Sequence, residues 1–175
     1  MTTAPDALKR ELAAGRERLL RAIAGVSEEQ FKRRPPDSET DQTPWCIGEV
    51  LAHLLQQERL RSERIALALR EDGAPVVPST QETHDEGARA GRMAPVPQLI
   101  HGLLAARRQT ERLIDAAAAL DGGFERAVLH PEHGRQTAGW LLETKIVAHE
   151  AEHVAQIEAL RLVVGAPPLA EAAKR

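Results

Sequence analysis

Apolar residues recur at steps of three and four through four long stretches of the chain, which is the spacing of one face of an α-helix. The pattern predicts helices over residues 6–24, from about 43–46 to 71, over 96–120 and over 137–164. Long polar connections separate these stretches. Four amphipathic helices joined in this way favour an all-α fold, a four-helix bundle with long crossover connections.

The connections carry their own local signals. Residues 27–30, Ser-Glu-Glu-Gln, form a capping box and predict a short further turn of helix. Prolines and polar residues fill 32–44 and 74–97, so both segments are predicted to be loops. The last connection, 124–136, is predicted to contain a short extended piece over 124–129.

The last predicted helix places two histidines on its apolar face. His149 and His153 continue a stripe whose other members are all aliphatic: Leu142, Ile146, Ile157, Leu160 and Val164. Residues four apart lie one above the other on a helix, so both imidazoles could reach one metal ion. Buried imidazoles could equally be satisfied by hydrogen bonds to neighbours, and the pair alone does not decide between these readings.

A functional metal site usually needs a third protein ligand. His53 is the strongest candidate, because it lies inside the second predicted helix on the side of Val50 and Leu54. One ligand from this helix and two from a facing helix could converge in the core of a bundle. The alternative for His53 is a core histidine that is hydrogen-bonded to a neighbour. His84 and His101 are expected at polar or exposed positions, and His130 and His133 in a loop that could border a pocket.

The string from His149 to His153 also matches the zinc-protease signature, but nothing downstream completes such a site, and a peptidase is disfavoured. Glu150, inside the string, is a weak catalytic candidate as a general base, weighed against a solvated surface glutamate. Gln57 and Arg107 fall near inward positions and are candidates, with His130, for the substrate pocket. Either could contact a ligand anion, or extend to the rim of the bundle.

Composition narrows the class of protein. The 175 residues carry a net charge of −3 and no basic patch interleaved with aromatic residues, which disfavours nucleic-acid binding. They fit one domain over residues 1–175. No run of residues is long and apolar enough to span a membrane, and no signal peptide is evident. The single cysteine, Cys46, excludes an internal disulfide, and a cytoplasmic location is expected. Its thiol, at a helix start, could be reactive or could pack under Trp45; packing is favoured.

Three segments together resemble the DinB-like superfamily, which includes the YfiT-like metal-dependent hydrolases. The segment Trp45-Cys-Ile-Gly-Glu-Val-Leu-Ala-His53 is similar to the opening of the family's second helix. His130-Pro-Glu-His-Gly134, followed by Gln136-Thr137, is similar to the lead into its last helix. His149 and His153, followed by Gln156 and Ile157, resemble its metal motif. One departure is Cys46, where the family usually has Ser or Thr as the helix cap, so the helix could start at Thr43-Pro44 instead.

The resemblance implies a bundle with His53, His149 and His153 as a three-histidine site for a divalent metal, zinc or nickel first, manganese or iron otherwise. It also implies a homodimer, and a low-molecular-weight thiol as co-substrate. The favoured function is therefore a metal-binding enzyme that acts on a small molecule through a metal-bound thiolate or water, of the thiol S-transferase or hydrolase type. The alternative is a non-catalytic, metal-binding, stress-associated dimeric protein. Activity measured with the metal intact would discriminate them.

Overall fold

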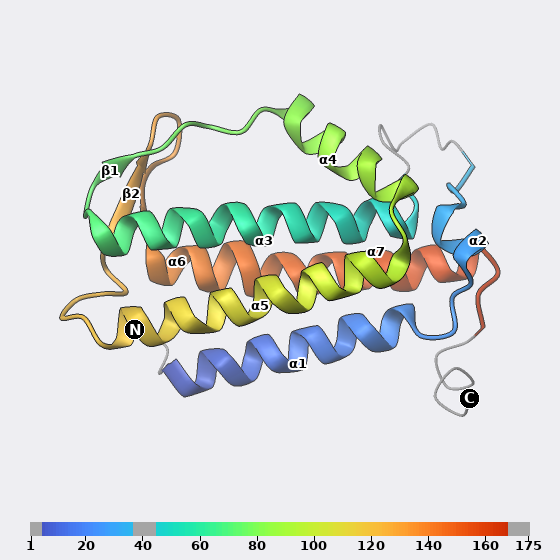
Figure 1. The fold of residues 1–175 in the computed structure, drawn as a ribbon, viewed down its shortest axis with the longest axis horizontal. Coiled ribbons are helices and arrows are strands. Elements are labelled where there is room, and N and C mark those ends of the chain that lie inside the picture. Colours follow the sequence, from blue (N-terminus) through green and yellow to red (C-terminus); the bar gives the residue numbers. More distant parts are fainter. Residues whose placement is uncertain (1–4, 37–44, 168–175) are drawn as a thin grey trace.

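A computed structural model describes residues 5–36 and 45–167 of the chain. Four long helical columns lie side by side: α1 (Pro5–Ile23), α3 (Ile47–Arg70), α5 (Val96–Ala118) and a last column of three segments (Figure 1). The last column consists of α6 (Ala138–Leu142), the π-helical η1 (Glu143–Ala148) and α7 (His149–Val163). The predicted four-helix bundle is therefore confirmed.

Chain direction explains the crossover connection. In Figure 1, α1 and the last column run one way, whereas α3 and α5 both run the other way. Two consecutive parallel helices need a connection that returns along the bundle, and residues 71–95 provide it. The segment 74–97 was predicted to be a loop, and that prediction is wrong. It contains the two-residue strand β1 (Ala74–Pro75) and the helix α4 (Gln81–Met93).

Helix α4 has no apolar stripe. It packs against α3 through small residues, which allow the two helices to come close together. Thr80 caps its first turn by accepting a hydrogen bond from the amide of Thr83 at 3.2 Å. A Cβ on Gly91 would collide with the Cβ of Ala52. The two helices therefore need glycine at this close approach. A cavity of about 430 Å³ remains between α3, α4 and α5, and none of the three candidate ligands lines it.

The ends of the other helices follow their local signals. Short α2 (Glu28–Lys32) starts at the predicted capping box, in which Ser27 and Gln30 bond reciprocally. Cys46 is the residue before α3, and its amide donates to Glu49 Oε2 at 2.8 Å. The alternative start at Thr43-Pro44 lies outside the described residues. Thr137 caps α6 as predicted, by accepting from the amide of Trp140 at 3.1 Å.

A small sheet closes one end of the bundle. Strand β2 (Ala127–His130) pairs parallel with β1 and antiparallel with β3 (Gly134–Thr137). The extended piece expected over 124–129 is thus shifted toward the C-terminus and extended by a second strand. Val128 lies opposite Gln136 in the register. Because side chains alternate along a strand, His130 faces the same side as Val128, which is buried in the core beside α3.

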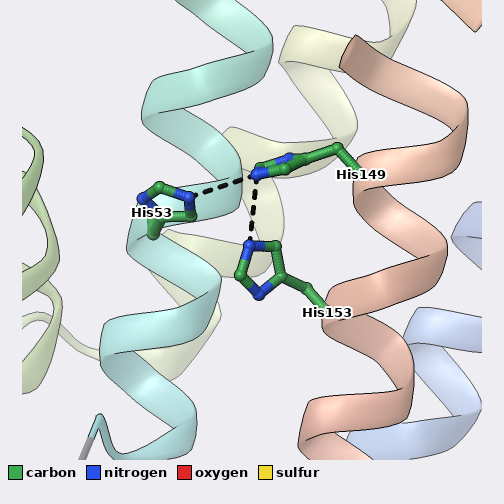
Figure 2. A group of neighbouring side chains, drawn as sticks. All are labelled: His53, His149 and His153. Carbon is green, nitrogen blue, oxygen red and sulfur yellow. Dashed lines mark hydrogen bonds between the residues drawn. The ribbon is translucent and has the colours of Figure 1, made fainter. Parts of the chain in front are cut away.

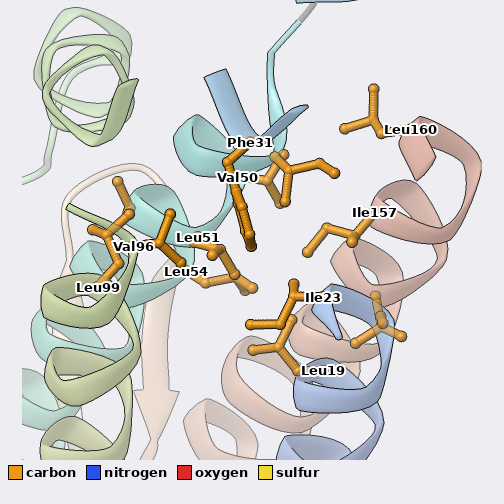
Figure 3. Close-up of a cluster of buried hydrophobic side chains, with 14 of the residues drawn as sticks. Leu19, Ile23, Phe31, Val50, Leu51, Leu54, Val96, Leu99, Ile157 and Leu160 are labelled. Atoms are coloured by element: carbon orange, nitrogen blue, oxygen red, sulfur yellow. The ribbon is translucent and has the colours of Figure 1, made fainter. Parts of the chain in front are cut away.

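The core consists of two apolar clusters. One holds the side chains of α1, α3, α5 and α7 that Figure 3 draws, among them Leu19, Leu51 and Ile157. The other lies toward the sheet and includes Leu12, Ile65 and Leu141. Between the clusters, each of the four columns contributes one buried charged residue; these are Arg16, Glu58, Arg107 and Glu150.

No helix of the described residues is long and apolar enough to cross a membrane.

Candidate metal centre

Three histidines converge between α3 and α7. His53 Nε2 lies 3.3 Å from His149 Nε2, which lies 3.2 Å from His153 Nε2 (Figure 2). His53 is buried, and the other two are half-buried. The trio proposed from the sequence is therefore one cluster, with its ring nitrogens directed at a common point.

Neighbouring side chains hold two of these rings. The Trp45 ring lies 4.8 Å from the His53 ring, centroid to centroid. Gln156, one turn beyond His153, places its Oε1 2.7 Å from His153 Nδ1. An amide oxygen can only accept, so Nδ1 carries the hydrogen and Nε2 keeps its lone pair free for a ligand. The sequence placed Gln156 in a family motif; its role as an orienting partner comes from the structure.

The protonation state also suits metal binding. Burial lowers the pKa of His153 below its ordinary value, against the opposing effect of the Gln156 hydrogen bond. A lowered pKa keeps the imidazole neutral at neutral pH, and only a neutral imidazole donates a lone pair to a metal.

The spacing of the nitrogens fits one ion. Two imidazole nitrogens bound tetrahedrally to zinc at about 2.0–2.1 Å are themselves about 3.3 Å apart. The observed separations are 3.3 and 3.2 Å. Three imidazole nitrogen donors suit zinc, nickel, manganese or iron, and leave coordination positions for a small molecule. The cluster is therefore able to hold a divalent metal.

Glu150 is not the solvated surface residue that the sequence favoured. Its side chain is buried, and its two carboxylate oxygens accept from Arg16 Nε at 2.8 Å and Arg107 Nη2 at 2.6 Å. Nothing in the sequence indicated this burial, because Glu150 lies outside the apolar stripe that includes His149 and His153. With both oxygens bound to guanidinium groups, the carboxylate has a structural partner already.

Arg107 is committed to the same network. Its Nε donates to Glu58 Oε1 at 2.8 Å, and its Nη1 donates to the carbonyl of Leu12. Arg16 Nη2 also donates to Glu58, at 2.6 Å. Burial alone would raise the pKa of Glu58, but the charge of Arg107 and its hydrogen bond hold that pKa below its ordinary value. Arg107 therefore fills the interior of the bundle, and its proposed contact with a ligand anion is not supported.

The other two candidates for the substrate pocket, Gln57 and His130, lie outside this network of buried charges. Gln57 is buried one turn after His53 on α3, and its Oε1 accepts from Arg61 Nη2 at 3.1 Å. His130 ends β2, is buried, and accepts through Nδ1 from the amides of Glu132 and His133. Sequence reasoning gave no weight to Arg61, which neighbours Gln57. The sequence did offer one signal: Arg61 follows His53 by eight residues, a spacing that keeps both on one face of a helix.

A bundle of four helical columns with three histidines converging between two of them defines a class of helical proteins equipped to bind a metal. The chain belongs to the DinB superfamily, whose family model matches residues 11–157. This membership confirms the resemblance seen in the sequence. No curated protein sequence matches the chain.

Two solved structures share the fold. YfiT from Bacillus subtilis, a probable metal-dependent hydrolase with an unusual four-helix bundle topology, superposes with a TM-score of 0.74 at 20% identity, covering 93% of this chain and 89% of YfiT. A histidine-to-alanine variant of a mycothiol-dependent maleylpyruvate isomerase superposes with a TM-score of 0.63 at 13% identity. That match covers 94% of this chain and 62% of the isomerase, so this chain spans less than two thirds of that protein.

Proposed function

We propose that His53, His149 and His153 bind a divalent metal, zinc or nickel first and manganese or iron otherwise, in a metal-dependent enzyme of the thiol S-transferase or hydrolase type. The observation that carries the proposal is the approach of the three Nε2 atoms to 3.2 and 3.3 Å. A divalent metal held there would lower the pKa of a thiol or water bound beside the histidines, and so supply a nucleophile at neutral pH.

The chain's own residues position and shield this centre. Gln156 fixes the orientation of the His153 ring, and Trp45 covers the ring of His53. Because His149 and His153 are one turn apart on one helix, their rings need little rearrangement on binding. His53 is buried and His149 and His153 are half-buried, which limits access of bulk water to the centre.

A thiolate nucleophile would have to come from a ligand. The chain has one cysteine, and burial raises the pKa of the Cys46 thiol to about 11. A thiol of that pKa is protonated at neutral pH and is a poor nucleophile. An external low-molecular-weight thiol, or water, is therefore the candidate. The descriptions of the relatives support both: YfiT as a probable hydrolase and the isomerase as mycothiol-dependent.

Metal analysis tests the proposal first. Protein purified without chelator should carry close to one equivalent of metal by mass spectrometry, and His149→Ala should fall below about one tenth of an equivalent, since two histidines alone rarely retain a metal. His101→Ala is the matched control, because His101 is exposed and outside the cluster. A chain that takes up no zinc or nickel, and whose thermal stability ignores both, would overturn the metal site.

Turnover is tested next. The metal-loaded protein is mixed with glutathione, mycothiol or bacillithiol and the electrophile monochlorobimane, and conjugate fluorescence is followed. We expect turnover with at least one thiol, and none with His149→Ala. A separate assay follows hydrolysis of an ester by the metal-loaded protein. Full metal occupancy without turnover in either assay would favour a non-catalytic metal-binding protein. The expected homodimer stays a prediction that light scattering can test.

A further inference from the structure

A row of polar side chains runs along α3 away from the metal centre. Gln57, Arg61 and Arg64 follow His53 at steps of four, four and three residues, and such steps keep residues on one helix face. The rise of about 1.5 Å per residue places Arg61 about 12 Å from His53 along the axis. Side chains on a helix tilt toward its N-terminus, so the arginines extend back in the direction of His53.

These two arginines lack the acidic partners that buried arginines usually have. Arg64 is 4% exposed, and Arg61 is partly buried. Within residues 5–36 and 45–167, no ion pair includes either of them. Arg61 donates to Gln57, and Arg64 donates to the carbonyl of Val77 at 3.4 Å. Burial, and then the charge of Arg64, lowers the pKa of Arg61 to about 10.

Arg16 and Arg107 show how the charge of other buried arginines is neutralised in this same bundle. Both are as buried as Arg64, and each is bonded to Glu58 and Glu150. A buried charge without a counter-ion is costly and is rarely kept without a function. The positive charge of Arg61 and Arg64 is therefore the unusual feature.

Polar atoms without partners accompany this charge. Gln57 is 3% exposed, yet its Nε2 has no hydrogen-bond acceptor, and neither has Nε of Arg61. Both atoms are donors. Buried donors left without a protein acceptor indicate a bound ligand or water that supplies one.

The sheet closes the other side of this region. His130 faces the core from β2, on the side where Val128 packs against α3, and the charges of Arg64 and Arg61 both lower the pKa of His130. His130, Glu132 and His133 have ligand atoms close enough for a metal, but Glu132 and His133 are exposed. The positive charges of Arg61 and Arg64 oppose a cation in this region and favour an anion.

We propose that Arg61 and Arg64, with the Gln57 amide and His130, form a subsite that binds a carboxylate group of the substrate pair. Guanidinium groups bind carboxylates through paired hydrogen bonds, which suits this anion. The inference deepens the proposed function and rests on it for the place of the reaction. It implies an elongated substrate whose carboxylate lies several bonds from the reacting atom, because about two to three helical turns separate the arginines from His53 along α3.

Binding of succinate to the metal-loaded protein, followed by calorimetry, tests the subsite without turnover. Arg61→Gln and Arg64→Gln should each weaken binding about tenfold, the expected effect of losing one charge-assisted hydrogen-bond pair. Arg59→Gln, an exposed arginine on another face of the same helix, should bind as the wild type does. Absence of succinate binding to a folded, metal-loaded protein, or equal binding by all variants, overturns the subsite.

Stability and metal content make the result unambiguous. Removing an uncompensated buried charge should leave the free energy of unfolding unchanged or raised, so the variants should fold. Both should keep their metal, whereas His149→Ala should lose the metal and still bind succinate. For the wild type, metal uptake without succinate binding thus rejects the subsite alone, and succinate binding by a wild type that takes up no metal rejects the proposed function alone.

Turnover then identifies which substrate carries the carboxylate. With chlorodinitrobenzene and its carboxylated analogue chloronitrobenzoate as electrophiles, a loss confined to the carboxylated one in Arg61→Gln assigns the group to the electrophile. A loss that follows glutathione and spares 2-mercaptoethanol assigns it to the thiol. An equal loss for every pair contradicts carboxylate recognition.

Discussion

His53 and His149 bring their Nε2 atoms to 3.3 Å although 96 positions separate them in the chain. A metal bound between α3 and α7 would therefore crosslink two helices that are distant in sequence. It would bind the folded chain and not the unfolded one. At a concentration one hundredfold above its Kd, such a ligand stabilises the fold by about 2.7 kcal/mol. We expect zinc to raise the Tm of the wild type and of His101→Ala, but not of His53→Ala. A zinc-induced rise that survives in His53→Ala would place the metal elsewhere.

Glu150 is expected to matter for stability. Glu150→Ala would leave Arg16 and Arg107 with one acidic partner where each now has two, inside the bundle. Breaking such a buried arrangement costs about 3–5 kcal/mol. Urea denaturation measures this loss, and Glu152→Ala, at an exposed position two residues on, should change stability by no more than about 0.5 kcal/mol. Equal stability of the two variants would contradict the structural role.

Cys46 is expected to be inert in the native protein. Its side chain is fully buried, and burial raises the pKa of its thiol to about 11, so at pH 8 about one molecule in a thousand carries a thiolate. Ellman's reagent should label the native chain only as fast as it unfolds, and label one thiol at once in denaturant. Rapid labelling of the native protein at pH 8 would show an accessible thiol and reopen Cys46 as a nucleophile.

His130 should titrate below its ordinary range. Burial, and then the charge of Arg64, lowers its pKa. Between this lowered pKa and the ordinary value of about 6.5, the unfolded chain binds more protons than the folded one, so stability rises with pH through that window and is lost as the solution is acidified. Proton NMR of the imidazole measures the pKa. Arg64→Gln should raise it, and Arg112→Gln, at an exposed position on α5, should leave it where it is.

The parts of the fold that follow from the sequence are those with a strong helical period. The stripes through Leu12 and Leu19, or through Val50 and Leu54, are long enough to identify amphipathic helices. Helix α4 has no such stripe, because it packs on α3 through Gly91 and its neighbours, and its proline-rich flanks resemble a loop. The strands were only partly foreseen, since two to four residues are too few to show a period.

The candidate site divides in the same way. His53, His149 and His153 could be grouped from the sequence, because spacing and family resemblance both point to them. The partners of Glu150 and Arg107 could not, because long charged side chains on an inward face are compatible with either the core or the rim. Arg16 and Glu58 carried no motif at all. Only the meeting of four helices shows that these charges neutralise one another.

The π-helical turn of η1, residues 143–148, determines the rotational phase of the histidines. A π-helical turn takes in one more residue than an α-helical turn does. If the same residues formed a plain α-helix instead, everything after them would be rotated by about 100° about the helix axis. Leu141 would still face the core, while His149 and His153 would turn away from His53. The wide turn is therefore itself part of the site, because it sets the angle at which His149 and His153 face His53.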